Sequence, residues 1–245
     1  MQVHLIAHTS FNEGRAASVS GYIPNSRVNP EWPTDSDGLS EFAGRLCYQS
    51  WSRPNPATAT NKGYLENIIN QGHFSVLEHA NATFYVTGVS RSLLAEITRH
   101  RHLSFSVISQ RYVRMQEFDV VIHPLLLREW DTQIQLPDGE TTTIGKAFND
   151  ATGAAFRAYD LLADKLMQLG YPRKKAMEAA REVLPNATGV DMVVTGNLRA
   201  WRDVISRRID PAADAQIQQF ARLVLARLKT LAPNAFQDFD LEEDA

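Results

Sequence analysis

Residues 99–112 hold the side chains of this chain that are best suited to chemistry. Their sequence is RHRHLSFSVISQRY, which contains three arginines, two histidines and three serines. Guanidinium groups are permanently charged planar forks that match phosphate oxygens. Serine hydroxyls add further donors, and imidazole can stack on a ring or titrate near neutral pH. The composition therefore indicates a pocket for phosphorylated ligands that contain a ring.

Composition alone also allows a plainer interpretation of this segment. A run rich in Arg and His is often a solvated loop or a contact with nucleic acid. However, the chain has 25 Lys and Arg against 28 Asp and Glu, whereas a dedicated nucleic-acid binder usually carries a strong positive bias. The basic residues are concentrated at 91–114 and 199–208, which favours small anionic ligands in a defined site over nucleic acid.

The detailed pattern resembles the signature of the flavin-dependent thymidylate synthases. Arg-His-Arg at 99–101 is followed by seven residues, then Ser109, then Gln-Arg-Tyr at 110–112. Residues 72–79 (GHFSVLEH), 178–188 (EAAREVLPNAT) and 197–202 (NLRAWR) are similar to three other segments of that family, and Arg208 follows at the family interval. The likeness runs from about residue 41 to residue 239 and is weak across the opening segment and near Asp138.

The resemblance implies an enzyme that converts dUMP to dTMP. It implies 5,10-methylenetetrahydrofolate as carbon donor, NADPH as reductant and bound FAD as cofactor, in a homotetramer whose active sites are shared between subunits. Two alternatives stay open, namely a folate- and flavin-dependent methyltransferase acting on uracil in RNA, and a nucleotide-binding protein without catalysis. The near-neutral charge counts against the first, and bound flavin would count against the second.

The same resemblance implies roles for individual residues. Arg208 would be the cation that activates uracil, and Ser109 would position the nucleotide. The residues implied for dUMP binding are Arg91, Glu96, Arg99, Ser109, Gln110, Arg111, Tyr112, Arg181 and Arg208. Those implied for FAD binding are Ser75, Arg99, His100, Arg101, Val107, Asn197, Leu198, Arg199 and Asp203, with His73 near the flavin and folate rings. Val107 and Asp203 depart from the family pattern, which more often has a polar side chain at the first and an amide or imidazole at the second.

Each of these residues has an ordinary structural role as its alternative. Arg181 could lie on a solvated helix face, and Asn197 could simply cap a helix. Arg208 near a helix C-terminus would complement the helix dipole, and Glu96 with Arg99 could be a surface ion pair. The joint match, in order along the chain, is what favours a site.

Other features bound the class of protein. Cys47 is the only cysteine, so we expect no intrachain disulfide, a reducing compartment and a buried, unreactive thiol. His73, Glu78 and His79 lack the His-Glu-x-x-His spacing of a zinc helix, so no metal site is predicted. No secretory signal is apparent and no apolar run approaches the roughly 20 residues needed to cross a bilayer. We therefore expect a cytoplasmic protein with no membrane partner.

The elements that must position these residues follow from hydrophobic periodicity. We predict strands over 3–7, 80–89, 118–123 and 190–195, and helices over 39–48, 64–69, 91–98, 146–169, 172–183, 197–208 and 216–231. Ser90 is the expected N-cap of the helix that leads into Arg99. In the long helix 146–169, Leu161, Leu162 and Leu169 belong to one apolar stripe. Neither a G-x-G-x-x-G motif nor a P-loop is present, so nucleotide binding cannot use those devices.

The predicted fold class is α+β, with an antiparallel or mixed sheet flanked by helices and a helical C-terminal half. We expect one domain spanning 1–245, in which 1–38 is irregular, 131–145 carries an exposed surface hairpin, and 240–245 is an acidic tail.

Overall fold

The computed structural model describes residues 1–22, 34–53, 55–115 and 120–240. The strands are β1 (Gln2–His8), β2 (Asn81–Ser90), β3 (Ser104–Val107), β4 (Gln133–Gln135), β5 (Thr141–Thr143) and β6 (Gly189–Asn197). The α-helices are α1 (Glu13–Ser20), α2 (Asp35–Tyr48), α3 (Asn61–Asn70), α4 (Arg91–Ile97), α5 (Pro124–Arg128), α6 (Ile144–Gln168), α7 (Arg173–Ala180), α8 (Leu198–Arg208) and α9 (Ala215–Leu231). Short 3-10 helices are η2 (Pro56–Thr58), η3 (Phe74–Glu78) and η5 (Arg181–Val183).

Four strands form the central sheet in the order β1-β2-β6-β3. Every neighbouring pair is antiparallel, and β6 lies between β2 and β3 although it is the last strand in the sequence. Side chains of β2 and β6 alternate between buried and more exposed positions, which is the pattern of a sheet packed on one face. The predicted α+β class, with an antiparallel sheet and a helical C-terminal half, is confirmed.

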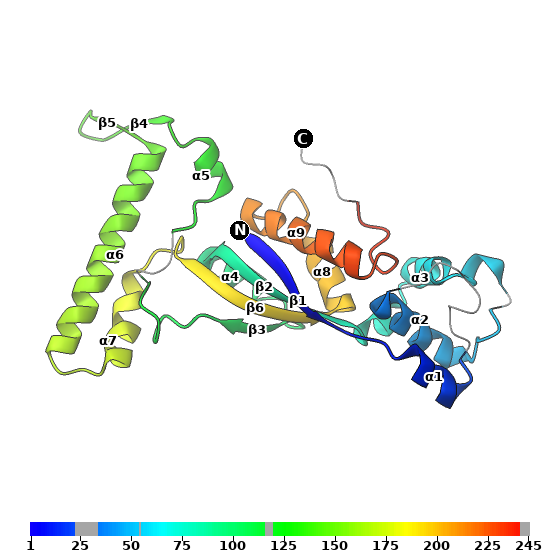
Figure 1. The fold of residues 1–245 in the computed structure, drawn as a ribbon. Coiled ribbons are helices and arrows are strands. Elements are labelled where there is room, and N and C mark those ends of the chain that lie inside the picture. The colour runs from blue at the N-terminus through cyan, green and yellow to red at the C-terminus, as the bar shows by residue number, and fades with distance from the viewer. Residues whose placement is uncertain (23–33, 54, 116–119, 241–245) are drawn as a thin grey trace.

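The hydrophobic core lies between this sheet and helices α8 and α9 (Figure 1). The ring of Phe84 on β2 meets that of Trp201 on α8 edge to face at 5.1 Å, and the Trp201 Nε1–H donates to the Ala82 carbonyl at 3.1 Å. Phe220 and Val224 of α9 are fully buried beside them. Because α8 is fixed to the sheet in this way, the residues at both of its ends have defined positions.

Helices α6 and α7 stand at one end of the molecule, and α1 to α3 lie at the other (Figure 1). The buried side chains of α6 include Tyr159 and Ala163, which form a small separate cluster with Met115 and Ala180. Leu161, Leu162 and Leu169 of the predicted apolar stripe are exposed. These three leucines face away from α7 and η5, the elements against which α6 packs most extensively among the described residues.

The prediction of an irregular segment over 1–38 is wrong for part of its length. Helix α1 and the beginning of α2 lie within it, with Asn12 and Thr34 as their N-caps. Helix α1 contains Gly and Ser, and the first turns of α2 contain Asp, Ser and Gly. These residues have weak helix propensity, so local composition concealed both helices. Residues 23–33, which belong to the same prediction, lie outside the described residues.

The prediction of a buried Cys47 is also wrong, because its thiol is exposed. The face of α2 that is buried instead carries Asp37, Glu41 and Arg45, whose charges are satisfied by partners. A periodicity count that treats charged residues as outward-facing assigns this helix the wrong inner face.

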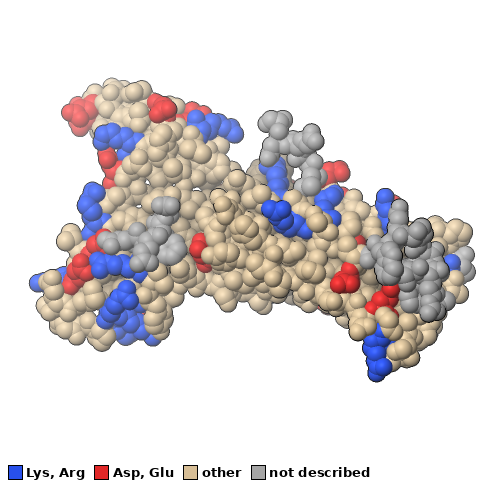
Figure 2. All heavy atoms as spheres, viewed as in Figure 1, with Lys and Arg blue, Asp and Glu red and all other residues tan. Residues whose placement is uncertain are grey.

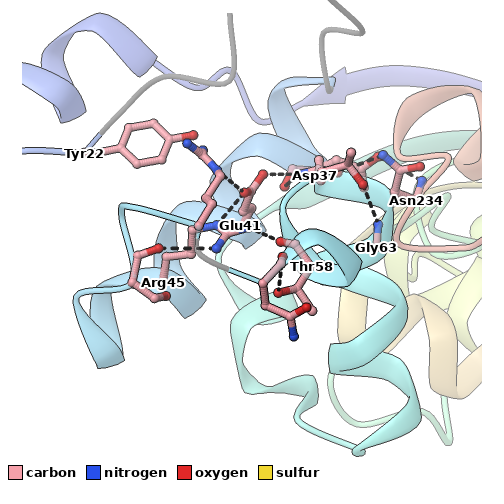
Figure 3. A network of polar contacts seen from close by, with 12 residues as sticks. Tyr22, Asp37, Glu41, Arg45, Thr58, Gly63 and Asn234 are labelled. Atoms are coloured by element: carbon pink, nitrogen blue, oxygen red, sulfur yellow. Dashed lines mark hydrogen bonds and ion pairs between the residues drawn. The ribbon is translucent and has the colours of Figure 1, made fainter. Parts of the chain in front are cut away.

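A network of polar contacts joins α2 to α3 and to the C-terminal segment (Figure 3). Glu41 accepts from Arg45 Nε at 2.5 Å and from Asn61 Nδ2 at 2.9 Å. Asp37 accepts from the backbone N–H groups of Asn234 and Ala235 at 2.9 and 3.0 Å. These contacts fix the end of the chain against a helix near its beginning.

The observed strands differ from the predicted ones at residues 118–123 and at β3. Over 118–123 the described residues contain an isolated bridge between Val120 and Thr188 and no strand, and residues 116–119 lie outside the described residues. Strand β3, within the Arg- and His-rich signature, was not predicted. A two-stranded hairpin of β4 and β5 occupies the segment where the sequence predicts one.

Among the described helices, none is both long and apolar enough to cross a membrane. The predicted acidic tail falls almost entirely on residues 241–245, which lie outside the described residues.

Candidate active site

A cavity of about 830 Å³ opens where the segment after α4 meets α8. This volume lies within the range of about 300–1,000 Å³ that is common for small-molecule sites. Its lining consists of Glu78, Arg99, His100, Arg101, His102, Leu103, Asn197, Arg199, Ala200, Asp203, Arg207 and Arg208. The fold thus brings two segments of the predicted signature together although almost a hundred residues separate them in the sequence.

The segment 99–103 is held between a capped helix and a strand. The Ser90 hydroxyl accepts from the Leu93 backbone N–H at 3.1 Å, which confirms Ser90 as the N-cap of α4. After Ile97 the backbone turns, with the N–H of His100 donating to the Ile97 carbonyl and that of Leu103 to the His100 carbonyl, both at 3.1 Å. Leu103 is buried and anchors the turn, so that the arginines on either side of His100 face the cavity.

Helix α8 begins at this cavity and is capped by Asn197. The Asn197 side-chain oxygen accepts from the Ala200 N–H at 2.8 Å, so the structural role considered for this residue is present. Because the N-terminal end of a helix carries partial positive charge and free N–H groups, it is suited to an anion. The lining residues Arg199 and Ala200 lie in that first turn.

Arg208 lies at the other end of α8, where its guanidinium is held by α4 and the turn that follows. Its Nη1 donates to Glu96 Oε2 at 2.9 Å, its Nη2 to the Glu96 carbonyl at 3.4 Å, and its Nε to His100 Nε2 at 3.0 Å. The predicted cation therefore lies at the cavity wall with a fixed orientation. Glu96 contacts Arg208 rather than forming the considered surface pair with Arg99.

His100 lies between two charged groups of α8. Its Nδ1 is 3.4 Å from Asp203 Oδ2, and Asp203 also accepts from Arg207 Nε at 2.7 Å. Burial, followed by the positive charge of Arg208, lowers the pKa of the His100 imidazole, and Asp203 opposes this. Asp203, unusual for the family signature, thus has two partners in this chain.

Several lining residues were not predicted. Glu78 is one of these, and it accepts from Nη1 of the predicted residue Arg199 at 2.5 Å. His102, Ala200 and Arg207 complete this group. Glu78 was considered only as a metal ligand, and its place at the end of η3 required the tertiary structure, whereas Arg207 could have been found from its position next to Arg208.

Other residues predicted for FAD lie near the cavity without lining it. His73 and Ser75 are exposed at the beginning of η3. The Leu198 side chain is fully buried in the core, and Val107 pairs with Met192 in the sheet. The Leu198 side chain is therefore closed to a ligand, whereas the Val107 side chain is only partly buried.

A second basic group lies around α7 and η5. It borders another hollow, of about 910 Å³, lined by Arg111, Leu166, Tyr171, Lys175, Glu178, Ala179, Arg181 and Glu182. Arg111 Nε lies 2.8 Å from Glu178 Oε2. Burial, followed by the positive charge of Arg181, lowers the pKa of Arg91, so that pair is also close. Lysine and arginine side chains are visible around this end of the molecule in Figure 2.

Ser109, Gln110 and Tyr112 belong to the turn that follows β3. The Ser109 carbonyl accepts from the N–H groups of Tyr112 and Val113 at 3.1 and 3.0 Å, and its hydroxyl accepts from Arg111 N at 3.4 Å. Gln110 is buried, whereas Tyr112 is exposed and its ring lies 5.0 Å from the Lys174 ammonium. This turn therefore belongs to the second basic group and not to the Arg208 cavity.

The two basic groups lie at opposite ends of β6. Gly189 at one end follows the α7–η5 segment, and Asn197 at the other caps α8. Eight residue steps of about 3.3 Å place these ends roughly 26 Å apart. Of the predicted dUMP ligands, Arg99 and Arg208 line the first hollow and Arg111 and Arg181 line the second, while Arg91 and Glu96 lie near opposite ends of α4.

Comparison with known proteins identifies the family. Residues 31–234 match the family model described as thymidylate synthase complementing protein. The chain is 45% identical to a probable flavin-dependent thymidylate synthase of Mycobacterium phage D29 over 99% of this chain and 97% of that protein. It is 47% identical to a flavin-dependent thymidylate synthase of Mycobacteroides abscessus over 86% and 84%, and 45% identical to that of Mycolicibacterium gilvum over 98% and 90%.

The chain belongs to the flavin-dependent thymidylate synthase family.

The region that matches the flavin-dependent thymidylate synthase family includes both basic groups. The matched region contains the turn at 99–103, the turn at 109–112, the α7–η5 segment and all of α8. A single family signature therefore supplies residues to two separate hollows of one chain.

Proposed function

We propose that this enzyme converts dUMP to dTMP, with 5,10-methylenetetrahydrofolate as carbon donor, NADPH as reductant and FAD as bound cofactor, in the cytoplasm. The observation that carries the proposal is the placement of Arg208 in the wall of the cavity, oriented by Glu96 and His100 beside the Arg-His-Arg turn. Family membership supports the reaction class.

The cavity residues fit a flavin dinucleotide. Arg99, Arg101 and Arg199 line it together with the first turn of α8, and this set of guanidinium and backbone N–H donors suits a diphosphate. When bound there, FAD would supply the hydride transfer that the reductive step requires. The chain itself would supply binding, orientation and charge.

Arg208 would promote the attack by uracil. C5 of uracil is a poor nucleophile until electron density is moved into the ring, and a positioned cation stabilises the anionic form electrostatically. Three of the five guanidinium N–H groups are engaged by Glu96 and His100. Among the described residues, one N–H on each terminal nitrogen has no such partner and remains for a carbonyl oxygen of the pyrimidine.

The dUMP phosphate would be bound by the second basic group, consisting of Arg91, Arg111 and Arg181. Arg111 and Arg181 border one hollow of the chain, whereas Arg208 lines the other. We therefore propose a homotetramer in which one subunit supplies the Arg208 cavity and another supplies the phosphate ligands, Ser109 and Tyr112. The exposed side chains of Leu161 and Leu162 on α6 and of its C-cap Leu169 support association of this kind.

An anaerobic assay tests the proposal. The purified protein is incubated with FAD, NADPH, methylenetetrahydrofolate and dUMP, and dTMP is measured by chromatography, with each component omitted in turn. We expect dTMP formation that requires flavin, folate and dUMP together. Flavin binding without dTMP would overturn the choice of acceptor and make RNA uracil the next substrate to test, while absence of both would refute the function.

A further inference from the structure

A continuous line of polar contacts runs from the mouth of the cavity to α4 through His100. The Asp203 carboxylate lies 3.4 Å from His100 Nδ1, His100 Nε2 accepts from Arg208 Nε at 3.0 Å, and Arg208 continues to Glu96 at 2.9 Å. The His100 side chain is only 8% exposed, whereas that of Asp203 is 47% exposed. The imidazole is thus enclosed between a fixed cation and a carboxylate at the solvent edge.

The two neighbours of His100 select the same tautomer. An arginine Nε–H can only donate, because the guanidinium has no acceptor and does not lose its proton. His100 Nε2 must therefore carry a lone pair, which places the ring proton on Nδ1. That proton faces a carboxylate, which can only accept when ionised. This is the tautomer opposite to the one that predominates in a free histidine side chain.

The charges around the ring favour the neutral form. The pKa of His100 is lowered by burial and by Arg208, with a smaller contribution from Arg207, and only Asp203 raises it. A second proton on Nε2 would place two donors against each other at 3.0 Å. The other charged or titratable groups that line the cavity are Glu78, Arg99, Arg101, His102 and Arg199, and cations outnumber Glu78 among them.

We propose that Asp203 and His100 are positioning residues for Arg208, with His100 held as the Nδ1–H tautomer so that its Nε2 fixes the plane of the guanidinium before substrate binds. This rests on the proposed function of Arg208. It also gives a reason for an acid at position 203, where an amide or imidazole is more usual in the family signature. The carboxylate holds the ring proton on the nitrogen that leaves Nε2 free to accept.

The tautomer can be measured without turnover. Solid-state NMR of the full-length protein, labelled with ring-¹⁵N histidine, distinguishes protonated from unprotonated nitrogens, and the signals of His100 among seven histidines are those lost in His100→Gln. At pH 7.5 we expect a protonated Nδ1 and an unprotonated Nε2. A protonated Nε2, or an average of the two tautomers, would overturn the proposal whether or not the enzyme makes dTMP.

Two variants should shift the His100 titration in opposite directions. Arg208→Ala removes a charge that lowers the pKa of His100, so the ring should gain its second proton at higher pH than in the wild type. Asp203→Asn removes the carboxylate that raises that pKa, so protonation should require lower pH. If His100 gained its second proton at the same pH in both variants, it would not lie between these two charged groups.

Kinetics separates positioning from a merely structural role. In His100→Gln the side-chain oxygen reaches the position of Nε2 and can accept from Arg208, whereas in His100→Asn it overlays Nδ1 and falls short. Because a hydrogen bond to a charged group is involved, we expect kcat of the Asn variant to be about tenfold below that of the Gln variant, with KM for dUMP less affected. Equal kcat values in two folded variants would refute the positioning role.

Discussion

At the scale of single residues, the environment of Arg208 differs from that of every other arginine proposed for the site. Its side chain is 17% exposed and contacts both a carboxylate and an imidazole, whereas Arg199 and Arg207 form ion pairs at more exposed positions. Exposed pairs are screened by solvent and contribute little. This fixed orientation is why the chemical role is proposed for Arg208 and a binding role for the more exposed arginines.

We predict that Arg208→Ala retains bound flavin but lowers turnover by at least about tenfold, since a single donor aimed at developing charge is commonly worth more than that. Flavin content is read from absorbance, and kcat from dTMP formation. Arg128→Ala, at an exposed position on α5, is the matched control and should resemble the wild type. Unchanged turnover in Arg208→Ala would remove this residue from the chemistry.

Asp37 makes stability depend on pH. Burial raises the pKa of this carboxyl from 3.8 to about 7, against the opposing effect of the N–H groups of Asn234 and Ala235. Between these two values the folded state holds the proton more tightly than the unfolded state. The contribution of Asp37 to stability is therefore fully present below the unfolded pKa, and it is lost as pH rises through the folded pKa.

We predict that Asp37→Asn is destabilised at pH 5, because the amide has one acceptor oxygen for two backbone donors. The difference in the free energy of unfolding between variant and wild type should shrink as pH rises, by on the order of 1.4 kcal/mol per pH unit up to about pH 7. Urea unfolding at pH 5 and pH 8 measures this, with exposed Asp35→Asn as control. A difference that widens with pH would contradict the assignment.

At the scale of elements, α2 and α3 are joined through charge rather than through an apolar seam. Glu41 is fully buried and contacts Arg45 and Arg53, which are also buried. The Arg45 guanidinium lies 4.4 Å from the centre of the Tyr64 ring and donates to the Thr58 carbonyl at 2.5 Å. Such a group is stable only while every charge keeps its partner.

We predict that Glu41→Gln lowers the free energy of unfolding by about 3 kcal/mol or more, because it leaves two buried arginines without their carboxylate. Chemical denaturation at constant pH gives the value. Glu66→Gln, at an exposed position on α3, should change stability by less than about 0.5 kcal/mol. Equal stability of the two variants would mean that the buried charges are compensated from elsewhere.

At the scale of the whole molecule, the separation of the two basic groups decides how the site can be built. Arg181 begins η5 and Arg111 lies in the turn after β3. Both border the hollow beside α7, at the end of the molecule where α6 and α7 stand (Figure 1). The proposed shared site would join these two hollows across a subunit interface.

We predict that inactive Arg208→Ala and Arg181→Ala proteins restore activity when they are co-expressed and assembled together. In a symmetric homo-oligomer with random assortment, about one quarter of the sites would combine both intact arginines. Two different affinity tags allow mixed assemblies to be isolated and assayed. If both residues served the same site from one chain, mixing would restore nothing.

The sequence by itself determined the family, the fold class and most of the regular elements. The apolar periodicity of α9, from Ile217 to Leu228, is fully buried as expected, and Ser90 caps α4 as its position suggested. These predictions are confirmed because helix caps and amphipathic faces depend on residues within one or two turns of each other. The resemblance also selected seven of the twelve residues that line the Arg208 cavity.

Only the tertiary structure decided which of these residues lie together. The inner face of α2 consists of charged side chains because distant partners satisfy them, and no local pattern reveals that Asp37 meets Asn234. The division of predicted nucleotide ligands between two hollows depends on strand order, since β6 pairs with β3 only after the chain has passed through α6 and α7. Contacts between segments that are remote in sequence are set by packing of the whole chain, and the role assigned here to Asp203 depends on such contacts.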